Sequence, residues 1–285
     1  MTFRWVLLSL LLAPTGLGAQ TGAASTESVR ALLDQARSLA GRNQPNAAAE
    51  ALGRAITLAP NSEDVLNAYA RFSLARSNPI QAILALEPLA RMQPGEAEYA
   101  YLLGVARMQV GEMAQAAEVL QEAAALDPGR ALTHIGLGLA LNRVDRFDEA
   151  RESLAAALRL EPDNVEALAA MSEAVEGLGN LDEATRLADR ALAVNPDHPT
   201  ALVTIGTARV KEGRFEEARD ALTRAVAVET QSIKGHYQLS LALARLGDRA
   251  GAERHLALSR EAQAAIEQHI ERLRAQPPLG SRAEP

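Results

Sequence analysis

Small and apolar residues recur along this chain with a period of 34 positions. One column of the period is always alanine, at Ala48, Ala82, Ala116, Ala150, Ala184, Ala218 and Ala252. Four positions later a second column is mostly leucine, at Leu52, Leu86, Leu120, Leu154, Ala188, Leu222 and Leu256. Residues four apart lie on the same face of a helix. The pattern therefore predicts a helix with a buried stripe in every period.

A second helix is predicted in the first half of each period. Its marker is a column of small residues, at Ala36, Ala70, Gly104, Gly138, Ser172, Gly206 and Ser240. Small residues on both helices let them cross closely, while leucine fills the flanking space. Glycine ends the first helix in four periods and suits a left-handed cap, at Gly111, Gly179, Gly213 and Gly247.

Proline near the end of a period separates one helix pair from the next, because it cannot donate a backbone hydrogen bond. It stands at Pro60, Pro94, Pro128, Pro162 and Pro196. The predicted pairs are residues 29–62, 63–96, 97–130, 131–164, 165–198, 199–232 and 233–266. Residues 252–274 read as one long final helix, which we expect to cap the open end of the array and to finish within residues 267–276. Residues 277–285 are expected to form a disordered tail.

The period and its columns resemble the tetratricopeptide repeat over about residues 29–266. The resemblance implies an all-α fold, a right-handed superhelical solenoid of about seven helix-turn-helix repeats with an extended C-terminal capping helix. It also implies that first helices line a concave groove, where such proteins bind segments of partners. His134 and His236 depart from the family pattern, because tryptophan or leucine is common at their position.

The resemblance places positions 2, 5, 9 and 12 of each repeat in the groove. The candidate partner-binding residues are Tyr101, Val105, Met108, Leu132, Ile135, Leu139, Asn142, Glu166, Glu173, Glu176 and Tyr237. Tyr101 and Met108 suit anchoring, because aromatic and thioether side chains adapt and bury large areas. Two alternatives stay open. The apolar residues of the fourth repeat could pack as core between first helices, and the three glutamates could form a solvated helix face.

Composition narrows the chemistry further. The chain has 285 residues and no cysteine, which excludes disulfides, thiolate metal sites and a cysteine nucleophile. A net charge of −7 disfavours a nucleic-acid partner. His134 and His236 stand three repeats apart and cannot share a metal. No phosphate-binding loop or hydrolase motif is present in the sequence, so we expect neither enzymatic activity nor a cofactor or metal.

The N-terminal residues form a separate segment. Arg4 precedes an apolar run from Trp5 to Leu12, and small residues follow up to Ala19. This order is typical of a secretory signal peptide, so residues 1–19 are expected to be removed and residues 20–28 to form a short leader. Export to the periplasm or the exterior follows, with no stable membrane insertion after cleavage. An uncleaved inner-membrane anchor is the alternative.

These features predict a non-enzymatic adaptor or scaffold of the bacterial cell envelope that binds a protein or peptide in its groove. Two alternatives remain, namely a self-associating structural scaffold and an accessory subunit of a secretion or export machine. The first of these would be a homo-oligomer.

Overall fold

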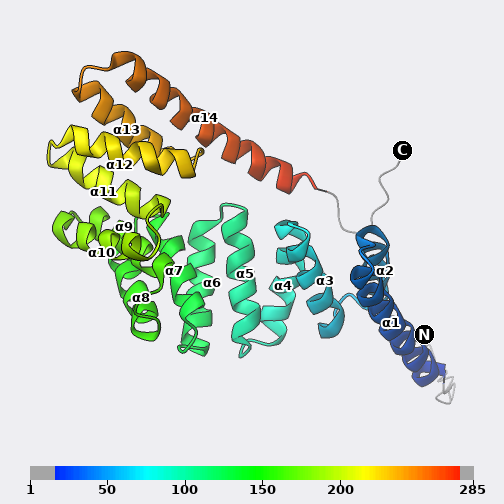
Figure 1. Cartoon of the computed structure of the whole chain (residues 1–285). Coiled ribbons are helices and arrows are strands. Elements are labelled where there is room, and N and C mark those ends of the chain that lie inside the picture. Colours follow the sequence, from blue (N-terminus) through cyan, green and yellow to red (C-terminus); the bar gives the residue numbers. More distant parts are fainter. Residues whose placement is uncertain (1–16, 277–285) are drawn as a thin grey trace, which may run out of the picture. The chain divides into compact units, whose positions relative to one another are not determined.

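The computed structural model describes residues 17–276, with side chains from residue 26 onward. Within this range every regular element is an α-helix (Figure 1). The helices are α1 (Leu17–Gly41), α2 (Pro45–Leu58), α3 (Glu63–Ala75), α4 (Pro79–Met92), α5 (Ala97–Gln109), α6 (Met113–Leu126), α7 (Ala131–Asn142), α8 (Phe147–Leu160), α9 (Val165–Gly177), α10 (Leu181–Val194), α11 (Pro199–Lys211), α12 (Phe215–Val228), α13 (Ile233–Arg245) and α14 (Arg249–Arg274). The predicted all-α repeat fold is confirmed. Most of the expected signal segment and the expected tail lie outside the described residues.

The described chain divides between residues 68 and 69 into two compact units. In the first unit α1 packs against α2. The helix α1 begins at Leu17, so the expected leader of residues 20–28 is helical and continuous with the first repeat helix. No proline occurs between residues 15 and 44, and alanine is frequent there, so nothing in the backbone interrupts the helix.

The second unit, which covers residues 69–276 of the described chain, contains α4 to α14 and part of α3. Each helix from α4 onward contacts the next one along the chain. The first helices of neighbouring repeats also touch, α5 with α7, α7 with α9, α9 with α11 and α11 with α13. These five helices therefore present one continuous surface.

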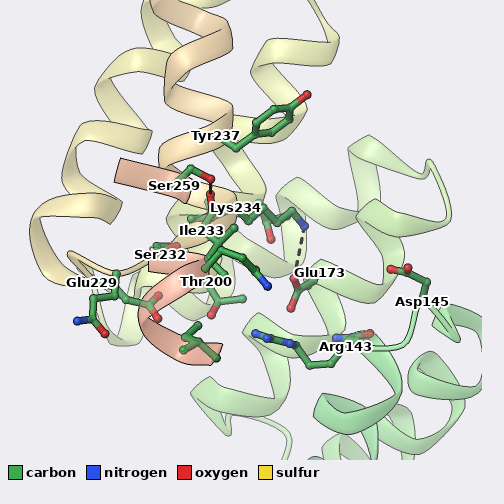
Figure 2. Close-up of a pocket in the computed structure, with 16 residues that line it drawn as sticks. Arg143, Asp145, Glu173, Thr200, Glu229, Ser232, Ile233, Lys234, Tyr237 and Ser259 are labelled. Carbon is green, nitrogen blue, oxygen red and sulfur yellow. Dashed lines mark hydrogen bonds and ion pairs between the residues drawn. The ribbon is translucent and has the colours of Figure 1, made fainter. Parts of the chain in front are cut away.

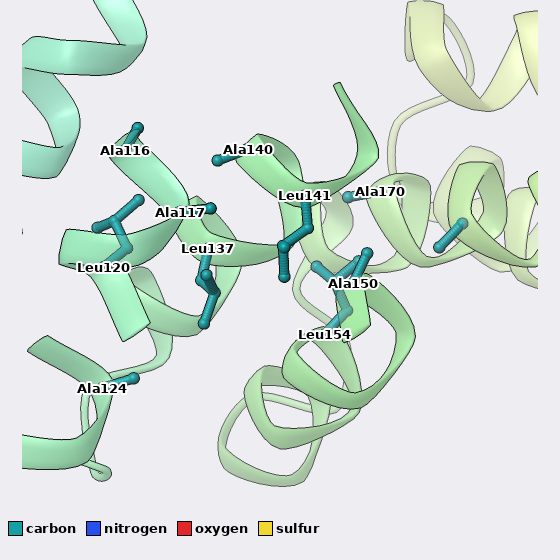
Figure 3. Close-up of a cluster of buried hydrophobic side chains, with 11 residues drawn as sticks. Ala116, Ala117, Leu120, Ala124, Leu137, Ala140, Leu141, Ala150, Leu154 and Ala170 are labelled. Atoms are coloured by element: carbon teal, nitrogen blue, oxygen red, sulfur yellow. The ribbon is translucent and has the colours of Figure 1, made fainter. Parts of the chain in front are cut away.

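The core repeats the small-and-large pairing read from the sequence. Leu120, Leu154 and Leu222 are completely buried. Each lies against a glycine of its partner helix, Gly104, Gly138 or Gly206, where an added Cβ would collide with the leucine. Figure 3 shows alanines and leucines of four successive helices meeting in one such cluster. The expected close crossings are present in these repeats.

The ends of the first helices follow the predicted caps. Gly111, Gly179, Gly213 and Gly247 all have φ between 78° and 89°, a region that favours glycine. Non-glycine residues with φ of 52° to 58° occupy the same position in three other repeats, at Asn43, Ser77 and Asp145. Asparagine and aspartate tolerate this conformation better than most residues.

The last helix is longer than its counterparts. The second helices α4, α6, α8, α10 and α12 each have 14 residues, whereas α14 has 26. The extra residues extend α14 by about 18 Å at 1.5 Å per residue. Its first part packs on α13, and its far end contacts α4. Figure 1 shows α14 running back from α13 towards the early helices of the second unit. The expected extended final helix thus also spans the array from its last repeat to an early one.

Candidate functional site

The first helices α7, α9, α11 and α13, together with α14, line an open hollow of about 600 Å³. Its lining includes Thr200 and Lys234 at repeat position 2, Val203 and Tyr237 at position 5, Glu173 at position 9 and Asn142 at position 12. These are the positions that the family resemblance assigned to the groove. We call the surface that these four positions form on α5, α7, α9, α11 and α13 the inner face. Ser259, Gln263 and Ile266 of α14 also belong to the lining, and Figure 2 shows Ser259 beside Ile233 of α13.

A charge cluster joins three helices beside the hollow. Glu176 of α9 is only 4% exposed and accepts hydrogen bonds from Lys211 of α11 at 2.5 Å and from Lys234 of α13 at 2.8 Å. Burial opposes ionisation of Glu176, but the charges and hydrogen bonds of Lys234 and Lys211 outweigh it, so its pKa lies below the ordinary value. Burial likewise lowers the pKa of Lys234, but Glu173 and Glu176 reverse this and raise it overall. Glu176 and Lys234 are therefore both charged at neutral pH.

A second polar cluster lies at Tyr101 of α5. The guanidinium of Arg130 stacks over the Tyr101 ring, 3.8 Å from its centroid. Arg130 also pairs with Glu98 at 2.5 Å, and Glu98 pairs with Arg71 at 3.5 Å. Arg130 therefore covers one face of the ring that the sequence suggested as an anchor.

Three of the predicted contact residues are buried by the fold. Ile135 is 5% exposed and packs with Ala157 and Ala167 between helices. Asn142 is 6% exposed, and its Nδ2 donates to the carbonyl of Ala170 at 2.9 Å. Glu176 is held by the two lysines. The alternative of inter-helix core is thus the right one for Ile135, and a solvated face is wrong for Glu176, because neighbouring repeats supply the atoms that cover them.

The other predicted residues divide into two groups. Leu132 is 55% exposed, Tyr237 is 46% exposed, and Glu166 is also exposed, beside His198 at 3.2 Å. The hydrogen bond from His198 lowers the pKa of the Glu166 carboxyl. The remaining residues are partly buried: Tyr101, Val105, Met108, Leu139 and Glu173. Tyr101, Met108 and Leu139 pack against the buried cluster of Figure 3, so they contribute to the core as well as to the surface.

Sequence reasoning missed the part that α14 plays in this site. Gln263 and Ile266 lie in the lining because α14 turns back over the inner face. The signal in the sequence was the apolar spacing of Ala262, Ile266, Ile270 and Leu273, which continues beyond the last repeat. It also missed the pair formed by His236 and His255, whose Nδ1 atoms are 2.9 Å apart at the α13–α14 contact.

Within the described residues, no group of three or more histidine, aspartate or glutamate side chains is placed to hold a metal ion.

None of the helices in the range 17–276 is both long and apolar enough to cross a membrane.

Comparisons of structure place the fold among known proteins. A solved structure of the MamA protein is 25% identical, with a TM-score of 0.56 over 59% of this chain and 92% of that one. A tetratricopeptide repeat protein from Parabacteroides merdae has a TM-score of 0.68 at 12% identity, over 87% of this chain and 99% of that one. The hetero-tetramer Cut9-Hcn1 of APC/C has a TM-score of 0.60 at 16% identity, over 81% of this chain and 48% of that one.

Sequence comparison gives the family directly. No curated protein matches the chain. Three family models, each described as tetratricopeptide repeat, match residues 30–62, residues 74–131, and residues 107–171 together with 145–204. Together these matches cover more than half of the chain. The chain therefore belongs to the tetratricopeptide repeat family.

Proposed function

We propose that the chain is a non-catalytic protein-interaction scaffold that binds a segment of a partner protein on its inner face. The hollow of about 600 Å³ between the first helices and α14 is the observation that carries this proposal. Exposed Leu132 and half-exposed Tyr237 offer apolar contact on the same face. Concave sites lined by apolar groups and a few polar groups are the usual places where ligands bind.

Charged groups of both signs line the hollow. Arg143, Asp145, Glu173 and Lys234 all belong to the lining, with Lys234 paired to Glu173 at 3.4 Å, and such charges would fix the register of a segment with mixed charge.

The test is partner capture by matched variants. Changing both Leu132 and Tyr237 to Ser should weaken capture from envelope extract by about 2–4 kcal/mol in total, because central apolar contacts carry most of the binding energy. Melting followed by circular dichroism should change little, since both side chains are largely exposed.

The control changes Leu126 and Leu160 to Ser, because these leucines are similarly exposed but end the second helices α6 and α8. Equal capture by both double variants would refute the inner face as the binding surface. Early melting of the Leu132 and Tyr237 variant alone would assign these residues to the core instead. Light scattering that shows the captured partner to be a second copy would favour the self-associating scaffold.

We also propose that the chain is exported. The order of Arg4, an apolar run and small residues up to Ala19 supports this proposal. Mass spectrometry of protein from the producing bacterium should find a mature N-terminus at or near Gln20. Recovery of intact Met1 in washed membranes would favour the anchored alternative.

A further inference from the structure

The two halves of α14 are held in different ways. The first half is joined to α13 by polar contacts, with Ser259 Oγ donating to the Ile233 carbonyl at 3.0 Å and the His236–His255 pair nearby. The far half, residues 262–274, extends beyond α13. It contacts α4 and the turn between α5 and α6. We call residues 262–274 the strap.

The strap shows its contact surface by its pattern of burial. Ala262 and Leu273 are buried, and Ile266 and Ile270 are partly buried. Their spacings of four, four and three residues form a single apolar stripe on a helix. Exposed residues such as Ala264 and Gln268 lie on the opposite side. The strap is therefore an amphipathic helix whose apolar side faces the array.

The far end of the strap contacts the turn at Gly111. An added Cβ on Gly111 would lie 2.7 Å from Cδ1 of Ile270. Gly179, Gly213 and Gly247 occupy the same position in later repeats with similar φ, and nothing lies within 4 Å of an added Cβ there. The turn at Gly111 is thus covered by a side chain from about 160 positions later in the sequence, whereas its equivalents are open.

We propose that the strap is an internal occupant of the surface formed by α4 and the turn at Gly111, beside the hollow, and that the external partner includes an amphipathic helix with the same apolar spacing, which takes the strap's place there. This inference rests on the proposed function and adds to it the class of partner and its regulation. The strap itself demonstrates that this surface accepts a helix with apolar residues at positions i, i+4, i+8 and i+11. Binding of an amphipathic helix in an apolar groove is a common recognition mode.

Competition by the strap has a measurable consequence. A helix added from outside binds only while the strap is undocked, so its apparent Kd is the intrinsic Kd divided by the open fraction. A strap that is docked about 90% of the time weakens external binding about tenfold. Disabling the strap should therefore strengthen binding rather than weaken it.

The first experiment uses a synthetic peptide of residues 259–276 as the probe and full-length chains as receptors. Changing Ile270 and Leu273 to Asp in the chain should undock the strap, since charged groups are costly in an apolar contact. This variant should bind the wild-type peptide at least about tenfold more tightly than the wild-type chain does. The matched control changes Ala264 and Gln268 to Asp, which adds the same charge on the exposed side and should behave as wild type.

Three results would overturn the proposal. The undocked variant could fail to bind the peptide, or it could bind the wild-type peptide and a peptide with the same two aspartates equally well. Light scattering could instead show a wild-type dimer that the Ile270 and Leu273 changes dissociate, in which case the occupant comes from a second copy. None of these results affects capture of the partner through Leu132 and Tyr237, so the proposed function is judged separately.

A second experiment keeps the strap intact and changes the surface under it. Asparagine suits a positive φ, as Asn43 does at the same repeat position. Gly111→Asn therefore keeps the turn but puts a polar side chain where Ile270 lies, and hydrogen exchange of residues 263–276 should become faster by about tenfold or more. Gly213→Asn is the control, with φ of 79° against 78° and open space above it. Equal exchange in both variants would contradict docking at Gly111.

Discussion

At the scale of the residue, the fold depends on pairs of small and large side chains that meet at fixed repeat positions. Leu154 occupies the space above Gly138, and Leu222 occupies the space above Gly206. Because interiors are packed at the density of organic crystals, a change of one methyl group on either side is felt. The alanine column has the same role, and Ala150 is completely buried among Leu141, Leu154 and Ala170.

Ala150→Leu should therefore destabilise the second unit by about 1–3 kcal/mol, because overpacking forces side chains out of their preferred rotamers. Ala125→Leu is the matched control, since Ala125 is exposed in α6 and the same atoms are added there at little cost. Urea unfolding followed by circular dichroism measures both. An equally stable Ala150 variant would mean that the crossing of α7 and α8 is looser than the structure indicates.

Residue-scale detail also sets the limit of what the sequence predicts. The columns of alanine, glycine and leucine identify helix pairs, caps and core, because the two helices of each repeat cross closely at the same positions. Exposure on the inner face differs from repeat to repeat. Leu132 is exposed, whereas Glu176, also at an inner-face position, is buried because lysines of the next two repeats cover it. Such covering depends on contacts between repeats, which one repeat's sequence does not contain.

At the scale of the element, Glu176 ties α9 to α11 and α13. Glu176→Gln should destabilise the unit by about 1–3 kcal/mol at pH 7, because it leaves Lys211 and Lys234 without their shared anion. The folded-state pKa of Glu176 is lowered, so its contribution is present above the unfolded value near 4.5 and is lost as pH falls below it. The difference between variant and wild type should therefore shrink on going from pH 7 to pH 3 in urea unfolding. Glu152→Gln, at an exposed position of α8, should show no such difference at either pH.

A pair of histidines joins α13 to α14. Nε2 of His236 donates to the Thr230 carbonyl, so its Nδ1 accepts the N–H of His255 when both rings are neutral. His134 makes the equivalent bond to the Pro128 carbonyl, which explains histidine at this repeat position. Burial, then the charges of His236 and Arg254, lower the pKa of His255, although Asp248 acts in the opposite direction.

A lowered histidine pKa makes stability fall on acidification. The neutral form stabilises the fold above the unfolded-state pKa near 6.5, and this contribution is lost as pH falls towards the folded-state value. Between pH 7.5 and pH 5.5, exchange-corrected protection of residues 249–262 should decrease in the wild type and in His269→Gln, since His269 is exposed. His255→Gln should lose less protection over this range. Identical pH profiles for His255→Gln and His269→Gln would remove the histidine pair as the cause.

At the scale of the whole molecule, α14 changes how a local loss of stability spreads through the second unit. In an open repeat array each repeat contacts only its neighbours, so a local loss of stability spreads to adjacent repeats and fades. Here the strap brings Ile270 back to Gly111, which joins the last repeat to an early one. Contacts of such large sequence separation are absent from an open stack and provide a second route between its ends.

This closure predicts a long-range effect that an open array would not show. Leu222→Ala removes a completely buried side chain between α11 and α12 and should cost about 2–5 kcal/mol. Hydrogen exchange should then rise in α11 to α14, and also around Gly111, because loosening α13 and α14 releases the strap, while α7 and α8 between them keep more protection. In a chain that also carries Asp at positions 270 and 273, Leu222→Ala should leave exchange around Gly111 unchanged, since the strap is already undocked. A response that decays evenly from α12 towards α5 in both backgrounds would show that the second unit behaves as an open array.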